Sequence, residues 1–185
     1  MAYVPIKTEW TIHIKDEKGR LTIPPKTLDE VLLVRRNLLA DQGKIITLSN
    51  DVEGSLERIL RLISARRNKA KSLDMEKLSF MNKFELFHKY IENGFVEVET
   101  KEKIDTNLDK IKEIIDIRNA FAHGDIILRD KIPYLRFKKK DGTTREISLE
   151  KDYLEKLYAT FDEIRDFLHK LNSYFSVLKN TEKKK

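Results

Sequence analysis

A regular repeat of apolar residues near the C-terminus constrains the fold of this chain more than any other feature. The repeat consists of residues spaced three and four apart in alternation, namely Leu154, Leu157, Phe161, Ile164, Leu168, Leu171, Phe175 and Leu178. A helix with this a/d spacing buries one narrow stripe along its whole length against other helices. We therefore expect a helix over residues 150–179 that packs lengthwise in a bundle or against a partner.

Earlier segments also carry apolar residues at helical spacing. Thr27 with Glu30 forms a capping box, and the helix that it opens is expected to end at Gly43. Asn50 with Glu53 repeats the cap signal and opens the next helix. Residues 45–48 between them fit a short strand and a buried connector equally well. Two further helices are expected over residues 75–93 and 105–122, each followed by a glycine.

Strand patterns occupy the remaining parts of the chain. Residues 10–14 alternate between apolar and polar and are expected to pair with residues 20–23. Residues 126–128, 132–137 and 144–149 look extended, and Asp141-Gly142 is a hairpin turn signal.

The expected fold class is therefore mainly all-α, an antiparallel helical bundle with small β additions. We expect a β-hairpin and helix as an extension over residues 1–48. The bundle follows over residues 49–180, with a hairpin around residues 126–149, and residues 181–185 form a basic tail.

Composition narrows the possible functions. The 185 residues include 37 Lys+Arg and 31 Asp+Glu, a formal charge of +6, and no cysteine. The sequence contains no apolar run long enough for a membrane span and no secretory signal, so we expect a cytoplasmic protein. Cysteine chemistry is excluded, and no pair of histidines has metal-ligand spacing. No glycine-rich nucleotide loop or nucleophile elbow is present, so neither a cofactor nor a metal is expected.

Polar chemistry is concentrated at the end of the expected helix over residues 105–122. The segment reads Ile117-Arg118-Asn119-Ala120-Phe121-Ala122-His123-Gly124-Asp125. Arg118 continues the apolar spacing of this helix and Ala122 resumes it, so a guanidinium is aimed at the core, where an unpaired charge is costly. Asn119 and His123 are four residues apart and share one ridge. In a purely structural alternative, Arg118 pairs with an acid such as Glu57 and His123 simply lies near a helix end.

This segment resembles the HEPN family, whose members carry an R-x4–6-H motif in a helical bundle. Here the motif is Arg118-Asn119-Ala120-Phe121-Ala122-His123, with a polar residue directly after the arginine as is usual in the family. The resemblance covers residues 50–178, with two helices before the motif and a long helix after it. It implies a homodimer with two facing motifs and metal-independent endoribonuclease activity. It also implies membership of a toxin–antitoxin, antiphage or CRISPR-associated system, with an antitoxin or another defence protein as a partner.

The residue types fit metal-free RNA cleavage. A histidine can exchange protons with the ribose 2′-hydroxyl or the leaving oxygen, and an arginine can stabilise the charge that develops on the phosphate. We therefore assign acid/base catalysis to His123, phosphate stabilisation to Arg118 and an orienting role to Asn119. Five residues turn a helix by about 500°, so Arg118 and His123 lie about 140° apart around its axis. A two-fold dimer would bring one chain's Arg118 to the other's His123.

Two basic clusters fit an RNA partner. They contain Arg66, Arg67, Lys69 and Lys71 in one stretch and Lys138, Lys139 and Lys140 in the other. Such residues neutralise phosphates, and Tyr134 or Phe137 could stack on a base. Ordinary solvated surface explains the same runs in a chain with 37% charged residues.

Two other functions remain open. The chain could be a non-catalytic module that dimerises, or binds a partner protein, through its last helix. It could equally bind RNA without cleaving it.

Overall fold

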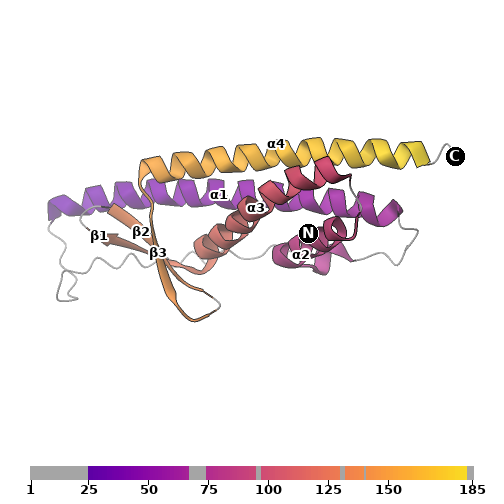
Figure 1. Ribbon diagram of the computed structural model, residues 1–185. Coiled ribbons are helices and arrows are strands. Elements are labelled where there is room, and N and C mark those ends of the chain that lie inside the picture. The colour runs from indigo at the N-terminus through magenta and orange to yellow at the C-terminus, as the bar shows by residue number, and fades with distance from the viewer. Residues whose placement is uncertain (1–24, 67–73, 95–96, 130–131, 140, 183–185) are drawn as a thin grey trace. The chain divides into compact units, whose positions relative to one another are not determined.

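The long C-terminal helix is present as α4, Lys151–Glu182, in the computed structural model (Figure 1). The structure describes residues 25–66, 74–94, 97–129, 132–139 and 141–182. All of the predicted α4 stripe from Leu154 to Phe175 is buried, and Leu178 is half-buried. The a/d spacing therefore predicted this helix and its buried face correctly.

The other elements give a mainly helical chain with one small sheet, as expected. They are α1 (Pro25–Arg66), the 3-10 turn η1 (Met75–Lys77), α2 (Phe80–Glu92), α3 (Val98–His123), β1 (Asp125–Arg129), β2 (Ile132–Lys138) and β3 (Thr144–Ser148). The hairpin predicted within residues 10–23 lies outside the described residues. No helix in the described ranges has both the length and the apolarity needed to cross a membrane.

The predicted break between two N-terminal helices is wrong, because α1 continues through Gly43 and Asn50 without interruption. A glycine in a helix costs only about 1 kcal/mol relative to alanine. Beyond Gly43 the helix buries Ile45, Ser49 and Val52 on one face, and the buried stripe continues to Ile63. The Ser49 hydroxyl donates to the Ile45 carbonyl at 2.8 Å, so even the polar member of the stripe is satisfied.

Two other helix starts differ from the sequence prediction. The helix predicted to begin at residue 75 is divided into η1 and α2, because the Ser79 side chain caps α2 by accepting from the Asn82 N–H. Gly94 follows α2 with a φ of +76°, as the predicted C-terminal glycine requires. α3 begins at Val98, seven residues before the predicted start at residue 105, and buries Ile104 in this extra part.

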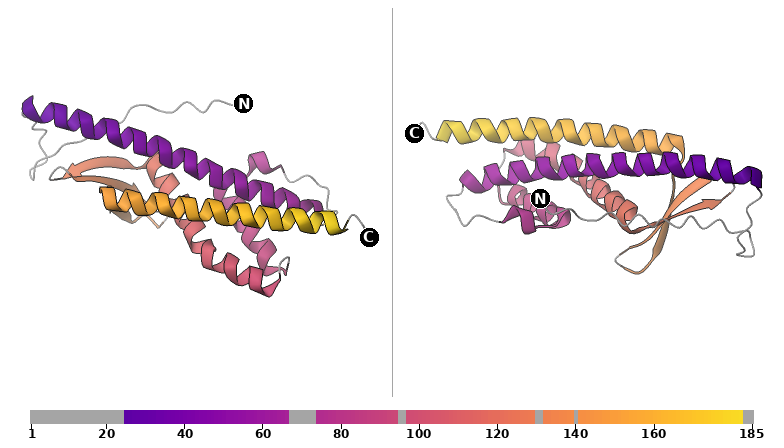
Figure 2. Two further views of the ribbon diagram at one scale, coloured as in Figure 1. Left: turned by 90° about the horizontal axis from the view of Figure 1, so that it is seen from above. Right: turned by 180° about the vertical axis from the view of Figure 1, so that it is seen from behind.

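The chain divides into two compact units. Among the described residues, one unit contains residues 25–44 with Asn119–Lys156 and is called the sheet unit below; the other contains Ile45–Arg118 with residues 157–182 and is called the helical unit. Within the helical unit, α1 and α4 run side by side in the same direction (Figures 1 and 2). The antiparallel order expected for the bundle therefore does not hold for this pair.

In the sheet unit, β1, β2 and β3 form an antiparallel sheet in that order. The pairing places Leu135 of β2 between Ile126 of β1 and Ile147 of β3. Leu135 is fully buried and Ile126 nearly so, which defines the inner face of the sheet.

The predicted turn between β2 and β3 is confirmed. Gly142 has a φ of +82°, and the Gly142 N–H donates to the Lys139 carbonyl. The Asp141 carboxylate accepts from the Thr143 hydroxyl and backbone N–H. These hydrogen bonds lower the pKa of Asp141.

A buried lysine links α2 to α1 in the helical unit. The Lys83 side chain is 6% exposed, and its ammonium lies 2.8 Å from carboxylate oxygens of both Glu53 and Glu57. Glu57 also accepts from Arg61. Burial by itself would lower the pKa of Lys83, but the bonds and charges of the two glutamates outweigh it and raise that pKa. The hydrogen bonds from Lys83 and then Arg61 lower the pKa of Glu57.

Replacing Lys83 should lower the free energy of unfolding less than replacing its two glutamate partners. We expect Lys83→Met to lower the free energy of unfolding by about 2 kcal/mol, since the two carboxylates that remain are partly hydrated. The double variant Glu53→Met/Glu57→Met should lose about 3–5 kcal/mol, because it leaves a buried ammonium without a counter-charge. Urea unfolding followed by circular dichroism measures both losses. A larger loss for Lys83→Met would contradict this arrangement.

The same cluster should make stability depend on acidity. Because the folded-state pKa of Glu57 lies below its ordinary value, its contribution is complete at neutral pH and is lost as pH falls through the folded-state pKa. We expect the wild type to lose more unfolding free energy than Lys83→Met between about pH 6 and pH 3. Equal losses in urea titrations at the two pH values would show that Lys83 does not hold the carboxylate in its ionised form.

Candidate functional site

The residues singled out by the sequence lie at the C-terminal end of α3. Asn119 and His123 are both exposed, and their spacing of four places them on one ridge of the helix, as predicted. Ala122 between them is exposed as well, so the prediction that Ala122 rejoins the buried stripe is wrong. The buried residues at this end are instead Ile117, Ala120 and Phe121. The exposed ridge therefore carries an amide and an imidazole, with only a methyl group beside them.

Arg118 has a different environment from its neighbours. Arg118 as a whole is half-buried, and its Nε atom is buried. This agrees with the expectation that the guanidinium is directed toward the core. The suggested pairing with Glu57 does not occur, because that carboxylate binds Lys83 and Arg61. Arg118 is the last residue of the helical unit on α3, and Asn119 is the first residue of the sheet unit.

Gly124 fixes the end of α3 against β2. Its N–H donates to the Ala120 carbonyl at 2.7 Å. A Cβ atom at this position would lie 2.5 Å from the Ala120 carbonyl oxygen and 2.8 Å from the Arg136 carbonyl oxygen. Only glycine permits this approach of helix and strand. Sequence reasoning assigned Gly124 to helix termination, whereas the structure adds a packing role.

Gln42 is a second residue that positions the site, and the sequence did not indicate it. Its side-chain amide donates to the Phe121 carbonyl at 3.0 Å, from 79 positions earlier in the chain. Carbonyls in the last turn of a helix have no partner within the helix, so this bond caps the end of α3. Gln42 and Gly124 together hold the end of α3, next to the exposed His123, against α1 and the sheet within the sheet unit.

The sheet continues directly from the site. Asp125 is the first residue of β1 and lies opposite Arg136 of β2, whose Nε donates to Glu146 of β3 at 2.7 Å. Alternation along β2 places Tyr134 on the face of Arg136 and Phe137 on the inner face with Leu135. Of the two aromatic residues considered for stacking on RNA, only Tyr134 therefore lies on the outer face.

The two predicted basic clusters are described only in part. Lys138 and Lys139 are exposed at the end of β2. Arg67, Lys69, Lys71 and Lys140 lie outside the described residues, as does the side chain of Arg66. Within the described ranges, no group of three or more histidine, aspartate or glutamate residues is arranged to hold a metal ion.

No protein-family model, no curated protein and no solved structure matches the chain.

The role of Gly124 can be tested against a glycine with no such constraint. We expect Gly124→Ala to lower the free energy of unfolding by about 1–3 kcal/mol, because the helix end and β2 must separate to admit the methyl group. Gly43→Ala is the matched control, since a Cβ there meets nothing within 4 Å. That variant should be neutral or stabilised by up to about 1 kcal/mol through helix propensity. Thermal unfolding of both variants measures the difference, and an unchanged Gly124→Ala would contradict the close approach.

Proposed function

We propose that this chain is a metal-independent endoribonuclease of the HEPN type that acts as a homodimer. The observation that carries the proposal is the exposed pair of Asn119 and His123 on the same helix end as the half-buried Arg118. The resemblance of the motif Arg118–His123 to that family supports it. The same resemblance supports a role as a toxin or antiphage-defence effector with a protein partner such as an antitoxin.

The proposed reaction uses only groups that this segment carries. One His123 imidazole takes the proton of a ribose 2′-hydroxyl, and the resulting oxygen attacks the adjacent phosphorus. The bond from phosphorus to the 5′-oxygen breaks, and the same imidazole, now protonated, gives its proton to that leaving oxygen. Arg118 stabilises the negative charge on the phosphorane, and Asn119 orients a phosphate oxygen. The products are a 2′,3′-cyclic phosphate and a 5′-hydroxyl, so atoms and charges balance without a metal.

A dimer supplies what one helix does not. Arg118 and His123 of one chain lie about 140° apart around the axis of α3. A two-fold axis near the end of α3 would place the Arg118 of one chain beside the His123 of its partner. The proposal therefore assigns each active site to two chains.

Burial of the α4 stripe weakens the alternative of a module that dimerises through this helix. Leu157, Ile164 and Phe175 are between 0% and 5% exposed in the single chain. The α4 stripe therefore serves the core of the chain itself. RNA binding without cleavage is the other alternative, and activity measurements separate it from the proposal.

The first test is cleavage of a mixed RNA pool in EDTA. We expect wild-type protein to cleave and His123→Ala to lose at least about a hundredfold in rate, in the range typical of a general acid or base. His88→Ala is the matched control, since this half-buried histidine of α2 lies in the other unit. It should retain wild-type activity. If the wild type and His123→Ala both bind RNA and neither cleaves it, the chain binds RNA without cleavage, which is the alternative function.

The shared site can be tested by mixing two inactive variants. Random exchange of Arg118→Ala with His123→Ala makes half of the dimers mixed, and each mixed dimer keeps one intact site out of two. We therefore expect about a quarter of the wild-type rate to return on mixing. If stable mixed dimers form but no activity returns, Arg118 and His123 of one active site belong to the same chain.

A further inference from the structure

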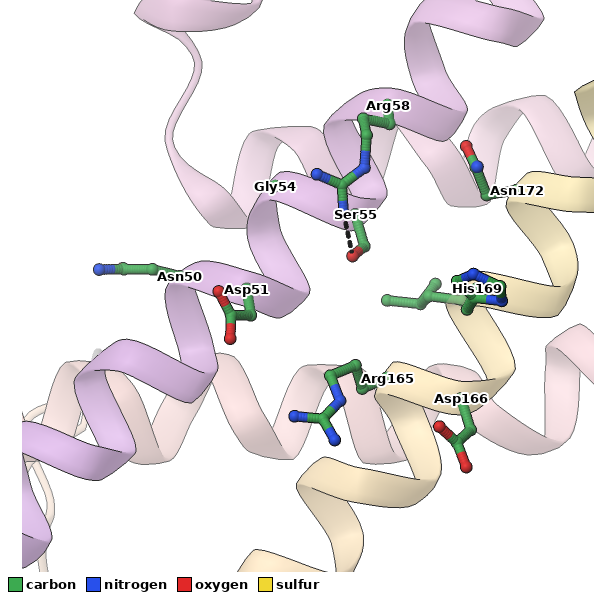
Figure 3. A pocket seen from close by; sticks show the side chains of 10 residues that line it. Asn50, Asp51, Gly54, Ser55, Arg58, Arg165, Asp166, His169 and Asn172 are labelled. Atoms are coloured by element: carbon green, nitrogen blue, oxygen red, sulfur yellow. Dashed lines mark hydrogen bonds between the residues drawn. The ribbon is translucent and has the colours of Figure 1, made fainter.

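A polar groove lies in the helical unit between α1 and α4, in a part of the chain to which the proposed nuclease assigns no role. Its cavity has a volume of about 370 Å³, within the range of small-molecule sites. Figure 3 shows side chains of both helices along it. No residue of the segment from Arg118 to His123 lines it.

The sequence explains why the groove is polar. On α1, Asp51, Ser55 and Arg58 directly precede the buried Val52, Leu56 and Ile59. On α4, three polar residues directly follow buried members of the α4 stripe, namely Arg165, His169 and Asn172. Both polar sets have spacings of four and three, so each forms a line on one helix face. The groove is therefore the solvent edge of the buried α1–α4 layer.

The two arginines of the groove keep their contacts within their own helices. Arg58 donates to the Ser55 hydroxyl at 2.8 Å, and Arg165 pairs with Asp162 at 3.2 Å. Among the described residues, no ion pair crosses the groove between α1 and α4. In coiled coils, the charged positions beside the apolar seam often form salt bridges between the helices. Arg165 extends toward α1, whereas the Arg58 guanidinium lies along its own helix, on Ser55 (Figure 3).

The charges are distributed unevenly along the groove. Arg58, Ser55 and Asn172 lie toward one end, which offers hydrogen-bond donors, and Asp51 and Arg165 lie toward the other (Figure 3). The carboxylate of Asp166 is turned away from α1 (Figure 3). A phosphate group would thus be attracted more strongly to the Arg58 end than to the other end, where the negative charge of Asp51 offsets the positive charge of Arg165. A carboxylate such as Asp51 accepts hydrogen bonds from sugar hydroxyls.

We propose that this groove binds a mononucleotide-sized phosphate monoester, with its phosphate at Arg58 and Asn172 and its ribose hydroxyls at Asp51. The site is independent of the proposed nuclease, because it uses none of the same residues. The ligand chemistry has two sources, a free nucleotide and the 5′-phosphorylated end of an RNA strand.

Titration of the ¹⁵N-labelled full chain with 5′-AMP, followed by NMR, tests the proposal. We expect saturable shifts at residues 50–58 and 165–172 and at least a tenfold weaker Kd for Arg58→Gln, which loses a charge-assisted contact. Arg36→Gln is the matched control, an exposed arginine of α1 outside the groove, and His123→Ala should also bind as the wild type does. Absence of saturable shifts up to about 10 mM, or equal binding by Arg58→Gln, would overturn the site.

Two further variants make the test specific. Asp51→Asn should weaken 5′-AMP but not inorganic phosphate, because only the nucleotide reaches that end. Gly54→Leu should block 5′-AMP by filling the groove, since a Cβ there meets nothing within 4 Å and leucine favours the helix. Binding by Gly54→Leu with wild-type affinity would overturn the site. If a short 5′-phosphorylated RNA displaces 5′-AMP, the natural ligand of the groove is the end of an RNA strand. If it does not, the natural ligand is a free nucleotide.

Discussion

Burial of one continuous apolar stripe on each long helix is the interaction on which the rest of this structure depends. Ile59 on α1, Ile111 on α3 and Phe161 on α4 all lie in such stripes and are at most 1% exposed. These stripes give the helices their length, because tertiary burial outweighs local penalties such as that of Gly43 within α1. They also influence what the other faces carry, since many positions next to a stripe are occupied by polar residues. The ridge of Asn119 and His123 and the edges of the α1–α4 groove are both such positions.

Close approach of helix and strand places the chemistry of the first of these sites. Gly124 brings the end of α3 against β2, and Gln42 caps the same end from α1. The imidazole of His123 is therefore presented on a part of the sheet unit that is held by backbone contacts. A group that exchanges protons with substrate gains from such support, because its backbone position is set before substrate binds. In the proposed reaction, Arg118 supplies the positive charge that a metal ion supplies in other nucleases.

The sequence predicted the elements whose signals are local. The spacing of the α4 stripe, the Asp141-Gly142 turn and the glycine after α2 each depend on a few neighbouring residues, and each was predicted correctly. The continuity of α1 was missed because Gly43 and Asn50 carry strong local stop and start signals. The buried face formed by Ile45, Ser49 and Val52 overrides those signals only in the folded chain.

The candidate site was predictable in its chemistry but not in its support. The spacing of four between Asn119 and His123 is enough by itself to place them on one ridge of a helix. No pattern links Gln42 to Phe121, or Gly124 to Arg136, because these contacts join distant parts of the chain. The α1–α4 groove was missed for the same reason, since the polar residues of each helix look like ordinary solvated surface when either helix is considered alone.

The chemical identity of the RNA ends is the measurement that tests the central claim most directly. A defined oligonucleotide cleaved in EDTA by the wild-type protein can be examined by mass spectrometry for the group left at the 3′ side of the cut. Attack by the ribose 2′-hydroxyl with proton transfer through His123 predicts a 2′,3′-cyclic phosphate opposite a 5′-hydroxyl. A 3′-hydroxyl opposite a 5′-phosphate would mean that water attacks the phosphorus, and it would contradict the proposed mechanism.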